Sequence, residues 1–117
     1  MQIQVNTDRH IEGGEALETS VRDVVAGAIE RFSDRITRLE IHIADVNSGV
    51  RSGPDDIRCT MEARVAGMRP LTVTHNAGTV DQAVAGAAAK LQKTLRRTLE
   101  RQRQTKGRTP YGGESPT

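Results

Sequence analysis

Four segments of the chain alternate apolar and polar residues, and this alternation limits the possible folds more than any other feature. They span residues 1–5, 38–46, 57–65 and 71–75. Successive side chains of a β-strand point to opposite faces, so each segment has one apolar and one polar face. A sheet built from such strands needs a covering layer on one side only. The sequence therefore predicts four strands whose apolar faces share one core.

Two segments with helical periodicity can supply the covering layer. Apolar residues recur every three or four positions over about 15–32, after a break at Gly13 and Gly14. A second helix is expected to run from a capping box at Thr79 and Gln82 to residue 104. The order is then β-α-β-β-β-α, which predicts an α+β two-layer sandwich, a four-stranded sheet with both helices on one face. The first helix would connect two parallel strands in a right-handed crossover, and the remaining strands would form an antiparallel meander.

Small residues make up the first half of the second helix, in the run AVAGAAA. Gly86 lies within this run, where a glycine costs about 1 kcal/mol of helix stability relative to alanine. Small side chains allow a helix to lie close to its neighbours, so we expect this half to pack tightly against the sheet or the first helix.

The remaining composition excludes several classes of protein. Phe32 and Tyr111 are the only aromatic residues, which leaves no platform for stacking the bases of single-stranded RNA. Cys59 is the only cysteine, so neither an intramolecular disulfide nor a paired-cysteine zinc motif is possible, and its strand position predicts a buried, inert thiol. The chain begins without a signal-peptide pattern and no apolar run approaches the roughly 20 residues of a membrane span, which predicts a soluble cytoplasmic protein.

Positive charge is concentrated at the end of the second helix. Residues 90–108 hold eight Lys/Arg and one acid, a net charge of +7, whereas the rest of the chain has a net charge of −5. Helix-dipole interactions account for cations in a last helical turn, but not for Lys90 and Lys93, which lie earlier. Such an asymmetry favours an anionic partner over a solvated basic helix.

Four of these cations share one side of the helix. Lys90, Lys93, Arg97 and Arg101 follow the spacing i, i+3, i+7 and i+11, next to the apolar positions. We call this set the basic stripe, and its geometry suits a row of nucleic-acid phosphates.

Two stretches resemble the ribosome hibernation-promoting factor/protein Y family, also called ribosome-associated inhibitor A. The first is TDRHIEGGEALETSVRDVVAGAIERFSDRITRLEIHIADVN and the second is KLQKTLRR. The resemblance extends over about residues 1–104. It implies the β-α-β-β-β-α fold, similar in layout to double-stranded RNA-binding domains.

The resemblance also implies a function without chemistry. The protein would bind rRNA of the small ribosomal subunit at the subunit interface and block translation by occupying the tRNA and mRNA sites. Carried over from the family, the RNA-binding residues would be Lys90, Lys93, Arg96 and Arg97, with Arg9 and Arg31 as helpers. The basic stripe adds Arg101 to this set.

Two features differ from the family pattern. Many relatives carry basic residues in the first helix where this chain has Val25 and Ala28, so we expect a narrower RNA-facing surface that depends more on the second helix. The chain also resembles a short form, with a ribosome-binding domain at 1–104, a disordered tail at 105–117 and no C-terminal dimerisation domain. Its own oligomeric state, and whether it pairs ribosomes or inactivates single ones, remain open.

Alternative functions rest on fewer residues. A free-standing binder of structured RNA could use the same basic helix, and a protein-interaction module could use a sheet edge or the tail. A small hydrolase would need His42 and His75 together on the polar face of the sheet. No carboxylate or cysteine lies at ligand spacing from these histidines, so the sequence predicts no catalytic residue, metal, cofactor or small-molecule substrate.

Other charged residues have simpler interpretations. Asp55 and Asp56 follow Gly53-Pro54 and fit a turn. His10 adjoins Arg9 and could lie near RNA. The open sheet face should carry Arg51, Arg58 and Arg64 in cross-strand ion pairs with Glu40 and Glu62.

Overall fold

The computed structural model describes residues 1–8, 11–46 and 56–107. Its elements follow the expected order β-α-β-β-β-α, with a short 3₁₀ turn after the first helix. They are β1 (Gln2–Thr7), α1 (Glu15–Ile29), η1 (Glu30–Phe32), β2 (Ile36–Asp45), β3 (Ile57–Val65), β4 (Leu71–Ala77) and α2 (Val80–Gly107).

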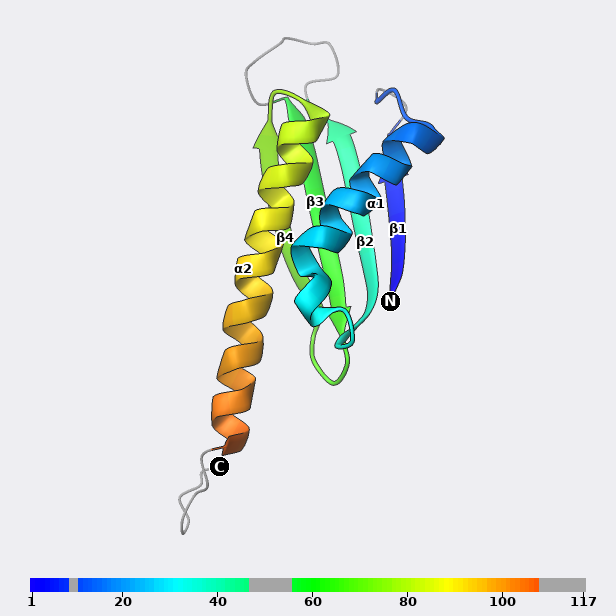
Figure 1. Ribbon diagram of the computed structural model, residues 1–117. Helices are drawn as coiled ribbons and strands as arrows, with labels where there is room; N and C mark the ends of the chain where they lie inside the picture. Colours follow the sequence, from blue (N-terminus) through cyan, green and yellow to red (C-terminus); the bar gives the residue numbers. More distant parts are fainter. Residues whose placement is uncertain (9–10, 47–55, 108–117) are drawn as a thin grey trace.

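The strands form one sheet in the order β1-β2-β3-β4. β1 pairs in parallel with β2, with Ile3 opposite Leu39, while β2–β3 and β3–β4 are antiparallel. The parallel connection through α1 and the antiparallel meander are therefore as the sequence predicts. Both helices lie across the same face of this sheet (Figure 1).

The core fills the space between the helices and the sheet. It combines the inward residues of the central strands with the apolar sides of both helices, and each large buried side chain contributes about 1.5–3 kcal/mol. The largest fully buried side chains are Ile29, Leu39, Ile41, Ile43, Met61, Leu91, Leu95, Val21, Val25 and Cys59. A register shift between Ile36 and Arg38 brings Ile36 into this core as well, so β2 starts two residues before the predicted 38–46.

The helix boundaries differ slightly from those predicted. The first helix is α-helical to Ile29 and then tightens into η1, where the backbone N–H of Ser33 donates to the Glu30 carbonyl. Thr79 caps α2, because its Oγ1 accepts a hydrogen bond of 3.1 Å from the N–H of Gln82. α2 continues to Gly107, three residues beyond 104, and its C-terminal part projects past the sheet (Figure 1). The rest of the expected tail, 108–117, lies outside the described residues.

The two described histidines lie on opposite faces of the sheet, so the arrangement required for the hydrolase hypothesis is wrong. His75 follows Leu71 and Val73 on the side that faces α2, where its ring lies against Gly86. His42 is on the open face, with Nε2 3.6 Å from Oε1 of Glu40. The two-residue period of β4 places His75 with its apolar neighbours.

No helix within the described ranges is both long enough and apolar enough to cross a membrane.

Candidate nucleic-acid interface

The core contacts of α2 hold its cations on the outside. Val84, Leu91 and Leu95 lie in the core with 0–2% exposure, and the next positions around the helix face solvent. Among the α2 residues whose side chains the structure describes, the exposed cations are Lys90, Lys93, Arg96, Arg97, Arg101 and Arg103. The positive charge is therefore accessible to a partner, and it is carried by a helix whose rotation is fixed by the core.

Lys90 of the basic stripe contacts the sheet as well as solvent. Its Nζ donates a hydrogen bond of 2.9 Å to the carbonyl oxygen of Thr74 in β4, the edge strand of the sheet. This bond ties the middle of α2 to β4. Lys93, Arg97 and Arg101 continue the stripe along α2 toward its C-terminus.

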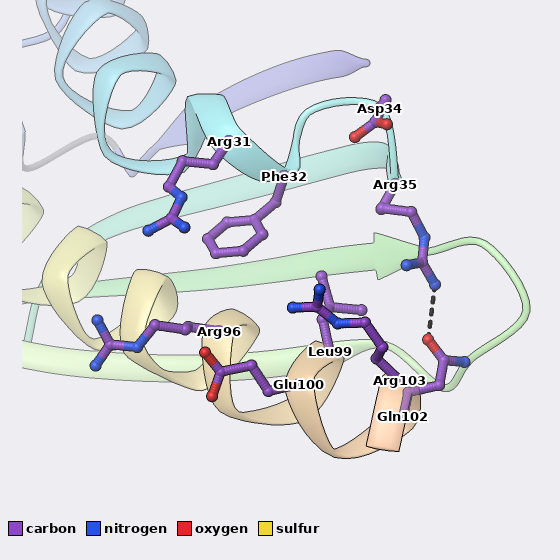
Figure 2. A pocket seen from close by; sticks show the side chains of 9 residues that line it. All are labelled: Arg31, Phe32, Asp34, Arg35, Arg96, Leu99, Glu100, Gln102 and Arg103. Atoms are coloured by element: carbon purple, nitrogen blue, oxygen red, sulfur yellow. Dashed lines mark hydrogen bonds between the residues drawn. The ribbon is translucent and has the colours of Figure 1, made fainter. Parts of the chain in front are cut away.

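Arg96 lies on another side of α2, which faces Arg31 of η1. The two arginines line a hollow of about 450 Å³ between η1, the start of β2 and the C-terminal part of α2 (Figure 2). We call it the arginine hollow. Its lining consists of four arginines, two acids, two apolar side chains and one amide: Arg31, Arg35, Arg96, Arg103, Asp34, Glu100, Phe32, Leu99 and Gln102.

Two contacts shape the arginine hollow. The guanidinium carbon of Arg31 lies 5.7 Å from the centroid of the Phe32 ring, within the range of a cation–π interaction. The guanidinium of Arg35 donates a hydrogen bond of 2.7 Å to Oε1 of Gln102. This bond joins the segment before β2 to the last turns of α2, and Figure 2 shows it closing one end of the hollow.

The expected RNA-binding residues thus divide into two groups. The basic stripe holds Lys90, Lys93, Arg97 and Arg101, whereas Arg31 and Arg96 line the arginine hollow. Arg9 lies outside the described residues, as do His10, Arg51 and Asp55. RNA contact by any of these residues stays a prediction.

Sequence reasoning missed two arginines of the hollow. Arg103 follows Arg96 by seven positions, a spacing that places both on one side of a helix, and this signal could have found it. Arg35 joins them only through the packing of the segment before β2 against α2, which no local pattern reveals.

The expectation for Val25 needs correction. Val25 has 0% exposure and belongs to the core, so its apolar side chain satisfies packing and does not replace a surface cation. The exposed residues of α1 include one cation, Arg22, and the acids Glu15 and Asp23. The accessible positive charge of the helical layer is therefore concentrated on η1 and α2.

The open face of the sheet interleaves arginines with glutamates. Arg38 pairs with Glu40 at 3.0 Å and Arg64 with Glu62 at 3.9 Å. These pairs join residues two apart on the same strand, so the expected cross-strand pairing is wrong: Glu40 lies opposite Glu62 in the register of β2 and β3. Arg58 donates to Oδ1 of Asn76. With acids and cations interleaved, this face offers an anionic partner less than α2 does.

Cys59 is a buried thiol, as its strand position predicts. It has 0% exposure, and desolvation raises its pKa from 9.0 to about 12. The thiol is therefore neutral and a poor nucleophile at neutral pH. Over the part of the chain that the structure describes, no group of three or more His, Cys, Asp or Glu side chains is placed to bind a metal ion.

Comparison with known proteins places this geometry in a family. No curated protein matches the chain in sequence. The crystal structure of the Protein Y N-terminal domain from Thermus thermophilus has a TM-score of 0.66 at 17% identity, over 84% of this chain and 99% of that chain. A ribosomal subunit interface protein from Coxiella burnetii has a TM-score of 0.63 at 14% identity, over 86% of this chain and 99% of that chain. These likenesses establish the fold. The sequence profile of the family described as Sigma 54 modulation protein / S30EA ribosomal protein matches residues 4–103. The chain therefore belongs to that family, as the resemblance predicts.

Proposed function

We propose that the protein is a ribosome-associated translation inhibitor that binds the small subunit at the subunit interface. Its cationic surface would meet rRNA there and exclude tRNA and mRNA from their sites. The family description and the subunit-interface neighbour support an association with ribosomes. The observation that carries the proposal is the exposed positive charge of α2, which the core fixes in position.

The physical basis is the release of counterions from RNA. Lys93, Arg97 and Arg101 can follow one strand of phosphates along α2, while Arg31 and Arg96 approach the RNA from the side of η1. If about five cations displace counterions, raising the salt from about 50 to 200 mM lowers the affinity roughly 10²–10³-fold. Inhibition follows from occupancy alone, in the cytoplasm where ribosomes work, and needs no catalytic residue.

Rigidity makes this occupancy effective. Leu91 and Leu95 anchor α2 with 0% exposure, and the hydrogen bond from Arg35 to Gln102 ties its later turns to the segment before β2. The backbone of α2 therefore has little conformational freedom to lose when its cations contact RNA, which favours binding.

Co-sedimentation with ribosomes tests the proposal. The protein should sediment with the small subunit at low salt and dissociate as salt is added. A Lys93→Glu/Arg97→Glu variant should lose this binding while its circular dichroism spectrum is unchanged, because both side chains are exposed. An Arg58→Glu/Arg64→Glu variant makes the same change in net charge on the open sheet face and serves as the matched control.

Two results would contradict the mechanism. One is unchanged sedimentation of the α2 variant. The other is an equal loss by the control, which would point to a nonspecific effect of net charge. If bulk duplex RNA competes with ribosomes for the protein at the same affinity, the protein is a free-standing RNA binder. If tRNA still binds fully to small subunits that are saturated with the protein, the occlusion step is excluded.

A further inference from the structure

The arginine hollow has one feature that a row of phosphate contacts does not need, an apolar floor. Phe32 and Leu99 are partly buried and pack against the core, and Figure 2 shows the Phe32 ring directed toward α2 between the arginines. We propose that the hollow binds a nucleoside monophosphate, with its base on the floor and its terminal phosphate among the guanidinium groups.

Size and stacking fit a base. A volume of about 450 Å³ falls within the range of about 300–1,000 Å³ typical of small-molecule sites. The Arg31 guanidinium lies over the Phe32 ring at 5.7 Å from its centroid, and aromatic rings and guanidinium planes are the two side-chain surfaces on which bases stack. Phe32 thus supplies, within the arginine hollow, a stacking surface that the scarcity of aromatic residues does not predict.

The charge of the lining selects the kind of phosphate. Four arginines against Asp34 and Glu100 give the lining a net charge of +2. A terminal phosphate carries about −1.5 to −2 at neutral pH, whereas an internal phosphodiester carries a single charge. A terminal monophosphate therefore neutralises the hollow, and arginine forks can hold its oxygens in bidentate fashion. The two carboxylates can accept hydrogen bonds from the amino groups of a base.

The ligand chemistry has two possible sources, a free nucleotide and the 5′-phosphorylated end of an RNA. The inference shares Arg31 and Arg96 with the proposed ribosome-binding surface but goes beyond it. Binding is measured without ribosomes, so its failure would leave the sedimentation result untouched.

Calorimetric titration of the full chain with AMP, adenosine and inorganic phosphate tests the two halves of the site. AMP should bind saturably, and more tightly than either fragment. The absence of saturable binding at millimolar AMP would overturn the proposal, and so would inorganic phosphate that binds as tightly as AMP, because the floor would then contribute nothing.

Single substitutions locate the site. Arg96→Gln should lower the affinity for AMP about tenfold or more, because a charge-assisted hydrogen bond is lost. Arg97→Gln is the matched control, since Arg97 does not line the hollow, and it should leave AMP binding unchanged. Phe32→Leu keeps an apolar side chain but removes the ring. The affinity for AMP should therefore fall about fivefold or more, while the affinity for inorganic phosphate stays the same. Equal effects of Arg96→Gln and Arg97→Gln would exclude the hollow as the site.

A short RNA with and without a 5′-phosphate distinguishes the sources. Binding of both AMP and the phosphorylated RNA with similar affinity supports the shared chemistry, and tighter binding of the phosphorylated RNA than of AMP identifies the RNA end as the source. Equal binding of the 5′-hydroxyl RNA would overturn the preference for a terminal phosphate.

Discussion

Replacing Gly86 by alanine should fail to stabilise the protein, although alanine is the best helix former. A Cβ atom at Gly86 would lie 2.1 Å from Cδ2 and 2.3 Å from Nε2 of His75. Nonbonded carbon atoms prefer about 3.5–4.0 Å, so the imidazole ring or the helix must move by more than about 1 Å. The gain in helix propensity is about 1 kcal/mol, and overpacking of this kind costs about 1–3 kcal/mol. We expect the free energy of unfolding to change by between about 0 and −2 kcal/mol.

A second background separates the two effects. His75→Ala removes all three ring atoms nearest to the added Cβ, so in that background Gly86→Ala should stabilise by up to about 1 kcal/mol. The difference between the two backgrounds is a coupling energy of about 1–3 kcal/mol. Gly27 in α1 provides the matched control, because a Cβ there meets nothing within 4 Å, and Gly27→Ala should stabilise by about 0.5–1 kcal/mol.

Urea unfolding followed by far-UV circular dichroism measures these values, since a domain of this size usually unfolds in a single transition. The reasoning would be refuted if Gly86→Ala stabilised the wild-type protein as much as Gly27→Ala does. In that case the imidazole ring would not lie in the path of the new methyl group, and the run of small residues would have another cause.

Two further expectations concern single groups. Burial raises the Cys59 pKa from 9.0 to about 12, so the unfolded state loses its thiol proton first. Stability should therefore fall by up to about 1.4 kcal/mol per pH unit between these two values, and a Cys59→Ala variant, compared by urea unfolding, should lack this component of the slope. Lys90 donates to the Thr74 carbonyl, so Lys90→Met should lower ribosome affinity less than Arg97→Met in the sedimentation assay, and equal losses would show that Lys90 leaves β4 to bind RNA.

Local patterns in the sequence were sufficient to predict the four strands, the two main helices and the faces they bury. The two-residue period of residues 57–65 specified β3 to the residue, because a strand buried on one face must alternate. The capping pattern at Thr79 specified the start of α2. The Thr79 hydroxyl accepts a hydrogen bond from the N–H of Gln82, which follows it by only three residues. Both signals are local, so they could be identified without the fold.

Contacts between distant elements depend on the packing of the whole domain. Arg35 and Gln102 are 67 residues apart in the chain, and their hydrogen bond exists because the core places the end of α2 beside the start of β2. The same packing places Lys90 beside the edge strand β4 and puts Arg31 and Arg96 around one hollow. A periodic pattern gives the direction of a side chain relative to its own element, whereas a site depends on the distance between elements, which the packed core sets.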